Sequence, residues 1–184
     1  MSAVPPAHTP PGPTVGVSLL VPQPWGSRLQ QARLDLGEAR ARHIPAHITI
    51  QPPTPASAGL DAVVAHIERV AARHQPFPVV LRGTGTFRPV SDVVFIQVAR
   101  GVSDCEVLQR RMRTGPLTRD LRFPYHPHVT IAHDLPAPDL DRVFDQLAGF
   151  CCEFVATHLT VFVHHGDEAW RPVHDVALGP GGDG

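Results

Sequence analysis

The sequence predicts an α+β fold in which two mainly antiparallel sheets flank a central cleft and the helices lie on the outside. One reason is a tetrapeptide pattern that occurs twice, as HITI at 47–50 and HVTI at 128–131. A second is that the same order of expected elements (strand, helix, motif strand, helix, strand) surrounds both copies. With 184 residues, 42% of them hydrophobic, the chain can also bury a core. We therefore expect one bilobal domain over 14–178, a duplicated unit with pseudo-two-fold symmetry.

Three elements are expected up to the end of the first motif. Residues 14–21 (TVGVSLLV) are apolar and partly β-branched, which favours a strand. After a Pro-Gln-Pro turn, apolar residues recur within 25–37 at spacings that indicate a helix. The first motif then belongs to a strand over about 44–50, which the prolines at 52, 53 and 55 are expected to end.

The elements between the motifs follow from the same kind of pattern. Apolar residues from Leu60 to Val70 recur at helical spacing and predict an amphipathic helix that ends near His74. Two valine-rich stretches, at roughly 77–83 and at 92–99, are expected to be strands. The next helix is expected to open with Ser103 as its N-cap, because a serine hydroxyl can bond a free amide of the first turn.

After the second motif, a helix is expected to begin near Pro138, whose fixed φ suits a first helical turn. Strands at 153–163 and 170–178 would complete the second sheet. The Pro-rich residues 1–13 are expected to form a disordered tail, and GPGGDG at 179–184 a flexible end, since neither can bury much apolar area.

The two motifs combine a chemical face with a core face. Side chains alternate along a strand, so the histidine and threonine of each motif share one face while Val or Ile occupy the other. Two imidazoles across a cleft can act as neutral base and protonated acid in displacement at phosphorus, and the hydroxyls can donate to phosphate oxygens. This chemistry needs no metal or other cofactor. Unperturbed histidine titrates at about 6.5, so an activity maximum near neutral pH is expected.

The histidines and threonines of the two motifs resemble the paired HxTx signatures of the 2H phosphoesterase superfamily, and most closely its bacterial 2'-5' RNA ligase family branch. The resemblance covers roughly 14–178. It implies a bilobal fold and metal-independent opening or hydrolysis of 2',3'-cyclic phosphates at RNA ends or in small nucleotides, with reversible 2'-5' ligation in some relatives. It also implies that the catalytic residues are His47, Thr49, His128 and Thr130.

Residues beside the motifs are candidates for substrate binding. Tyr125 and Phe87 could stack on a base, although packing in the core or at the rim explains them as well. His126 would share a face with the second motif histidine, although a solvated loop histidine is the more common case. Arg88 and Arg122 could bind phosphate, although most arginines are surface charges.

Two other functions stay open on the sequence. His126, His128 and His133 could hold a metal for a hydrolase, but the alternation of a strand sends His133 to the opposite face. The polar stretch 164–168 (HHGDE) could also bind a metal or form a hairpin tip. A non-catalytic RNA-binding module that kept the cleft is the second alternative. We predict no metal site and no cofactor.

Composition excludes some functions. All 16 basic residues are arginine, so chemistry that needs a covalent lysine, such as lysyl-adenylate or Schiff-base formation, is excluded. A net charge of -1 gives no general field that attracts nucleic acid, so an RNA end or a small cyclic nucleotide must be held locally. Three cysteines in no paired pattern fit a reducing compartment. Without a signal-like or membrane-spanning apolar run, we expect a cytoplasmic monomer that does not contact membranes.

Overall fold

The computed structural model describes residues 12–37, 41, 44–166 and 169–180. Most of the tail predicted at 1–13, and the last four residues of the chain, lie outside this range. The elements are β1 (Thr14–Leu20), α1 (Trp25–Asp35), β2 (His47–Pro55), α2 (Leu60–Ala72), β3 (Phe77–Thr86), β4 (Val93–Arg100), α3 (Val102–Met112), the 3-10 helix η2 (Gly115–Leu117), β5 (His128–His133), α4 (Ala137–Gln146), β6 (Cys151–Ala156), β7 (His158–His164) and β8 (Trp170–Ala177).

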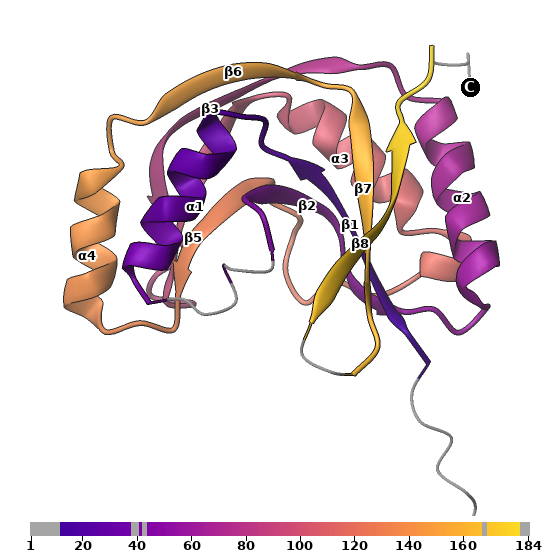
Figure 1. The fold of residues 1–184 in the computed structure, drawn as a ribbon, viewed down its shortest axis with the longest axis horizontal. Helices are drawn as coiled ribbons and strands as arrows, with labels where there is room; N and C mark the ends of the chain where they lie inside the picture. The colour runs from indigo at the N-terminus through magenta and orange to yellow at the C-terminus, as the bar shows by residue number, and fades with distance from the viewer. Residues whose placement is uncertain (1–11, 38–40, 42–43, 167–168, 181–184) are drawn as a thin grey trace, which may run out of the picture.

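The strands form two four-stranded sheets, in which every neighbouring pair is antiparallel. The His47 sheet has the order β2-β1-β7-β8, and the His128 sheet has the order β5-β4-β3-β6. Each motif strand is therefore an edge strand, paired with the first strand of its own half of the chain. Figure 1 shows β2 and β5 side by side at the centre of the molecule, where the two sheets meet.

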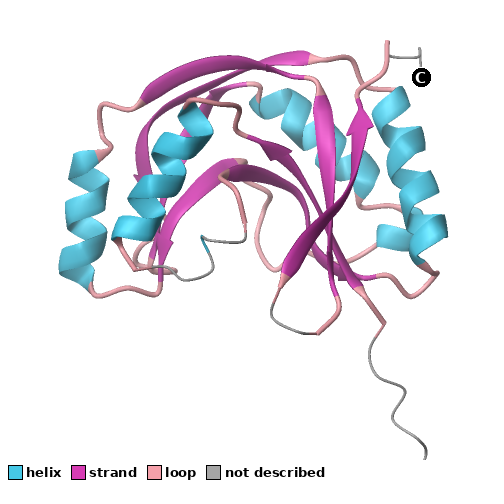
Figure 2. Cartoon of the chain, in the orientation of Figure 1, coloured by secondary structure: helices cyan, strands magenta, loops and turns pink. Residues whose placement is uncertain are grey.

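The helices lie on the outside of the sheets, as Figure 2 shows. Helices α2 and α3 contact strands of the His47 sheet, whereas α1 and α4 contact strands of the His128 sheet. The helix that precedes each motif strand thus packs on the sheet of the other half. This arrangement confirms the predicted α+β fold of two antiparallel sheets with pseudo-two-fold symmetry.

The core confirms the alternation predicted for the motifs. Ile48, Ile50, Val129 and Ile131 are completely buried, while the histidines and threonines between them are half-buried on the opposite face. Both motif strands bury this apolar face in the one hydrophobic cluster that joins the sheets to the helices. The chemical groups are therefore held by strands whose other side is fixed by close packing.

The prediction that prolines end the first motif strand is wrong. Strand β2 begins at His47, not near residue 44, and continues through Pro52 and Pro53 to Pro55. Its last residues still pair with β1, since Thr54 lies opposite Val15. Proline lacks the amide that a central strand needs, but β2 is an edge strand, where a missing donor on the outer side costs no ladder hydrogen bond.

The single strand predicted at 153–163 is in fact two strands that belong to different sheets. Strand β6 pairs with β3 in the His128 sheet, and β7 pairs with β1 in the His47 sheet. The chain changes sheets at Thr157, whose carbonyl accepts a hydrogen bond from the Leu178 amide. The last two strands therefore complete the first sheet, not the second as predicted. Burial alternates along β6 but is nearly continuous along β7, because β7 is a central strand.

Ser103 is not the N-cap of α3. The helix starts after Gly101, which has a φ of 92° and makes no side-chain cap, and Ser103 lies within the first turn. A β-carbon on Gly101 would also approach the carbonyl oxygen of Pro78 to 2.9 Å. Only glycine meets both requirements without strain, so the backbone and not a hydroxyl decides where the helix begins.

The described end of the chain is tied to α2. The Gly179 amide donates to the Ala71 carbonyl at 2.9 Å, and the Gln75 side chain donates to the Pro180 carbonyl at 2.8 Å. These contacts fall within the segment 179–184 that was expected to be flexible. Among the described helices, none combines the length and the apolar character needed to cross a bilayer.

Ile48→Ala should lower the free energy of unfolding by about 2–5 kcal/mol, because it leaves a cavity behind the first motif. Val90→Ala, at a position that is 71% exposed, is the control and should change it by less than about 0.5 kcal/mol. Urea unfolding at one pH measures both values. Equal losses in the two variants would contradict the packing described here.

Candidate active site

Both motif histidines are held in the same way. The Nδ1 atom of His47 lies 2.7 Å from the Pro45 carbonyl oxygen, and that of His128 lies 2.7 Å from the His126 carbonyl oxygen. A carbonyl can only accept, so Nδ1 carries the proton in each neutral ring. Nε2 is then the atom left with a lone pair on both histidines. Each ring therefore presents the same nitrogen for proton transfer.

The two motifs lie close together in space. Strands β2 and β5 are in contact, and the charge of His128 is near enough to influence His47. Tyr125, three residues before His128, reaches across to β2, where its hydroxyl donates to the Thr49 carbonyl at 2.9 Å. This bond ties the segment before the second motif to the strand of the first.

A pocket of about 190 Å³ lies beside the first motif. His47 and Thr49 line it together with Ser18, which is paired with Thr49 across the β1–β2 ladder. Phe162 from β7 and Trp170 from β8 supply its apolar part. The pocket thus brings an imidazole and two hydroxyls next to two aromatic rings.

Aromatic side chains surround the second motif. The ring centroid of His128 lies 5.0 Å from that of Phe87 and 5.1 Å from that of Phe95. The His126 ring is stacked with the His128 ring at 6.2 Å. Thr130 is paired with Phe95 across the β4–β5 ladder. Of the residues predicted to contact substrate, Phe87 and His126 therefore do lie beside a motif histidine.

Burial sets the protonation of both motif histidines. It lowers the pKa of His47, the hydrogen bond to Pro45 partly offsets this, and the positive charges of Arg33 and His128 lower that pKa further. Burial also lowers the pKa of His128, with a partial offset from the hydrogen bond to His126 and a further decrease from the charge of the His126 ring. The assumption of unperturbed histidines, made on the sequence, is therefore wrong.

Arg33 supports the first motif from α1. This buried side chain donates from Nη1 to the Ile44 carbonyl at 2.8 Å, and Gln30 donates to the same oxygen at 3.3 Å. Ile44 immediately precedes Pro45, whose carbonyl orients His47. A helix that packs on the opposite sheet thus positions the backbone that fixes the first histidine.

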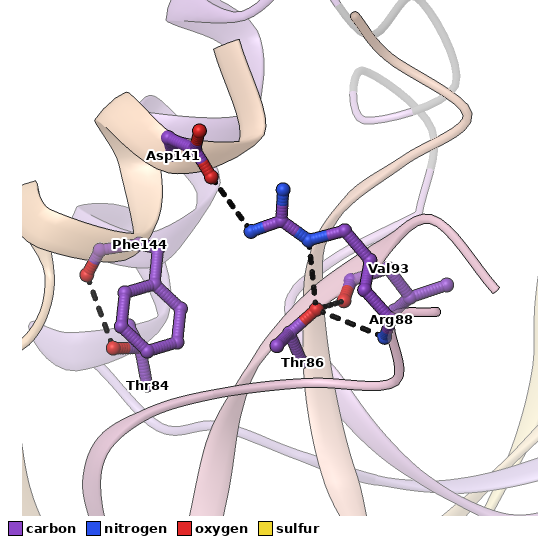
Figure 3. A network of polar contacts seen from close by, with 6 residues as sticks. All are labelled: Thr84, Thr86, Arg88, Val93, Asp141 and Phe144. Atoms are coloured by element: carbon purple, nitrogen blue, oxygen red, sulfur yellow. Dashed lines mark hydrogen bonds and ion pairs between the residues drawn. The ribbon is translucent and has the colours of Figure 1, made fainter. Parts of the chain in front are cut away.

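Arg88 makes a different set of contacts from those predicted. Figure 3 shows its guanidinium directed toward α4, where Nη2 lies 2.8 Å from the Asp141 carboxylate. Its Nε donates to the Thr86 hydroxyl at 3.3 Å, and the Thr86 hydroxyl donates to the Val93 carbonyl at 2.8 Å. These contacts tie the β3–β4 turn to α4, so phosphate binding by Arg88 stays a prediction that they do not support.

No group of three or more His, Cys, Asp or Glu side chains within the described residues is arranged to hold a metal ion. His133 interacts with Asp134, and the His164 ring packs against Trp170. Asp167 and Glu168, part of the polar stretch considered as a metal site, lie outside the described residues.

Several residues of the site were missed by the sequence analysis. Phe95, Phe162 and Trp170 look like ordinary apolar strand residues, and only the strand pairing places them beside a motif. Arg33 was missed because its helix packs on the sheet of the other half.

Known proteins resemble this chain in sequence. A model of the 2'-5' RNA ligase superfamily matches residues 20–168. A protein from Geobacillus thermodenitrificans whose name describes it as a phosphoesterase is 29% identical over 105 residues, which are 56% of this chain and 60% of the relative. The match thus spans about three fifths of that relative. Another from Oceanobacillus iheyensis, named in the same way, is 24% identical over 139 residues, 74% of this chain and 81% of the relative.

Solved structures resemble this chain in fold. The E. coli LigT complex with NADP+ has a TM-score of 0.61 at 18% identity, over 90% of this chain and 97% of LigT. The LigT complex with 3'-AMP gives 0.60 at 17% identity, with the same coverage of 90% and 97%. Kluyveromyces marxianus Usb1 with uridine monophosphate gives 0.50 at 12% identity, over 93% of this chain and 100% of Usb1. At such identities the likeness shows the fold alone.

The ring titrations of His47 and His128, followed by NMR and assigned with the His47→Ala and His128→Ala variants, should both have midpoints below about 6.5. The unfolded chain then binds more protons than the folded chain between the folded and unfolded pKa values. The free energy of unfolding should therefore fall as the pH is lowered from about 6.5 through the folded pKa. That part of the pH dependence should be absent from the double variant. Midpoints above the ordinary value would contradict the burial described here.

Proposed function

Because the chain belongs to the 2'-5' RNA ligase superfamily, we propose that it is a metal-independent phosphoesterase acting on 2',3'-cyclic phosphates, at an RNA end or in a small nucleotide. The observation that carries the proposal is the matched pair of histidines, each bonded through Nδ1 to a carbonyl and each followed by a threonine on the same face. The nucleotides in the LigT and Usb1 complexes support the substrate class.

In the proposed reaction, water attacks the phosphorus between the two motif histidines. The neutral histidine takes the water proton on Nε2 as the new P–O bond forms. The protonated histidine gives its Nε2 proton to the ribose oxygen as the old P–O bond breaks. The Thr49 and Thr130 hydroxyls donate to the non-bridging oxygens, where negative charge develops. With a 5'-hydroxyl in place of water, and with the 3'-oxygen as the leaving group that takes the proton, the same steps give a 2'-5' linkage.

The surroundings of the two histidines favour one division of roles. Arg33 places a positive charge near His47, whereas the group that acts on His128 is the titratable His126 ring. When one proton is shared between the motif histidines, the permanent charge of Arg33 disfavours its residence on His47. We therefore assign His47 as the general base and His128 as the general acid for hydrolysis.

The aromatic rings beside each motif suit a nucleoside. Phe162 and Trp170 form the apolar part of the pocket next to His47, at a place where a base attached to a bound phosphate could stack. Phe87 and His126 offer a similar surface next to His128. Substrate binding by Phe87 and His126 is part of this proposal, whereas Tyr125 is assigned a positioning role through its bond to Thr49.

His47→Ala and His128→Ala should each reduce turnover of a nucleoside 2',3'-cyclic phosphate by about 10²–10⁴, the usual effect of removing an acid or base. Thr49→Val and Thr130→Val should reduce it by roughly 10²–10³ if each hydroxyl stabilises transition-state charge. His158→Ala, at an exposed position at the start of β7, is the matched control and should retain wild-type kcat/KM.

Assays with and without EDTA test the metal-dependent alternative. Turnover should be the same in both, because protons move between imidazoles and charge is stabilised by hydroxyls. Loss of activity with EDTA and recovery with zinc would instead support a metallohydrolase. A folded protein that binds nucleotides but turns over none of them would support the non-catalytic alternative.

For the natural type of leaving group, kcat/KM should be a bell-shaped function of pH with its maximum below about 6.5, since the pKa values of both histidines are lowered. The leaving group of a nitrophenyl ester needs no proton, so the alkaline limb of the pH profile should disappear with this substrate. With the ester, His128→Ala should reduce kcat/KM little, whereas His47→Ala should still reduce it strongly. Equal damage from the two variants would reject the assigned roles.

A further inference from the structure

A second and larger pocket, of about 820 Å³, lies between α3 and the segment 120–125 that leads to the second motif. Its lining includes Arg110, Arg113 and Arg122 together with the aromatic side chains of Phe123 and Tyr125. The pocket shares no lining residue with the one beside His47. The reaction described above does not use it.

The cationic and aromatic groups of this pocket are available to a ligand. Arg110 and Arg122 are exposed, and neither guanidinium group has a hydrogen-bond or ion-pair partner among the residues that the structure describes. The guanidinium carbon of Arg122 lies 5.2 Å from the ring centroid of Phe123, which is 55% exposed. Open aromatic and guanidinium planes beside phosphate-binding arginines are typical of surfaces that bind single-stranded nucleic acid.

Two N–H groups of pocket-lining residues lack an acceptor. Gln109 is 3% exposed, and its Nε2 has no partner among the described residues. The Nε of Arg113 also has none there, although Nη1 of the same residue donates to the Arg119 carbonyl at 3.1 Å. Buried donors are nearly always satisfied by protein, water or ligand. Both nitrogens are closed to solvent, so they are not contacts for a ligand in this pocket, and the proposal below rests on the exposed groups alone.

Glu106 and Asp120 also line this pocket, so it is not uniformly positive. Carboxylates repel a run of phosphates, but they accept hydrogen bonds from the amino groups of bases. A mixture of arginines, carboxylates and an exposed ring therefore matches a nucleotide, which has both a phosphate and a base, better than it matches an inorganic polyanion.

Tyr125 connects this pocket to the active site. Its ring lines the pocket, and its hydroxyl is bonded to the Thr49 carbonyl. Phe123 precedes His128 by five residues in the chain, so the two are separated by at most roughly 17 Å of extended backbone. This distance is no longer than a few nucleotides of extended single-stranded RNA.

We propose that this pocket is a strand-binding subsite, which holds the nucleotides that precede a terminal 2',3'-cyclic phosphate in single-stranded RNA. The inference rests on the proposed function and makes it narrower, because it names an RNA end and not a free mononucleotide as the preferred substrate. Arg122 and Phe123 form the stacking surface, and Arg110 and Arg113 face the phosphates.

Kinetics with two substrates test the subsite: a nucleoside 2',3'-cyclic phosphate, and a short RNA oligonucleotide that ends in the same group. Arg122→Ala and Phe123→Ala should each raise KM for the oligonucleotide about tenfold, as expected for the loss of one contact to a base or phosphate. The kcat for the oligonucleotide and both constants for the mononucleotide should be unchanged. Arg142→Ala, at a 62% exposed arginine on α4, is the matched control and should leave KM and kcat unchanged for both substrates.

Salt dependence gives a second measure. A plot of log kcat/KM for the oligonucleotide against the log of salt concentration should have a negative slope. In Arg110→Ala this slope should be shallower than in the wild type by about 0.7 for each phosphate contact that is lost. Equal effects of the variants on both substrates, or no effect on the oligonucleotide, would overturn the proposal.

Binding separates failure of the subsite from failure of the proposed function. Fluorescence anisotropy with a labelled RNA oligonucleotide ending in a 3'-phosphate requires no turnover. Arg122→Ala and Phe123→Ala should weaken this binding about tenfold while Arg142→Ala does not. If the wild type cleaves neither cyclic phosphate, the proposed function is wrong, and the anisotropy measurement alone then tests the subsite. The subsite proposal is overturned if the wild type does not bind the RNA, or if the pocket variants bind it as tightly as the wild type.

Discussion

The geometry of the candidate active site depends on two hydrogen bonds, those that hold Nδ1 of His47 and of His128 to the carbonyl two residues earlier. Each bond fixes a tautomer and a ring direction, but only if the backbone before the motif strand is itself fixed. On one side Arg33 and Gln30 hold the Ile44 carbonyl, and on the other Tyr125 is bonded to Thr49. The Tyr125 bond reaches a strand of the other half of the chain. Arg33 and Gln30 belong to the same half as His47, but their helix α1 packs on the His128 sheet.

Much of the fold and the centre of the site could be predicted because they follow from local patterns. The alternation of polar and apolar residues in each motif placed the histidines and threonines on one face without any knowledge of their partners. The sequence did not show to which sheet β7 belongs. That is decided by its pairing with β1, a strand more than a hundred residues away in the chain. For the same reason Phe162 and Trp170 were not recognised, whereas Phe87 and His126, close to the second motif, were.

Duplication has given the two histidines the same geometry but different neighbours. His47 lies near a buried arginine and lines a pocket with Phe162 and Trp170, whereas His128 is packed among Phe87, Phe95 and His126. In the proposed reaction, equal hydrogen bonds leave the same atom, Nε2, free on both histidines, and the unequal charges around them distinguish the base from the acid. A symmetric backbone can therefore support a reaction whose two proton transfers run in opposite directions.

The exchange of strands between the halves also bears on how the protein is made. Strand β1 leaves the ribosome first, yet one of its two neighbours, β7, spans residues 158–164. Domains generally fold from the N-terminus as synthesis proceeds, but this sheet cannot be completed until β7 and β8 have been translated. The His128 sheet, whose strands all precede residue 157, can assemble earlier. Until β7 is made, β1 can pair with β2 on one side only, and its other, apolar edge stays open to wrong pairing and aggregation.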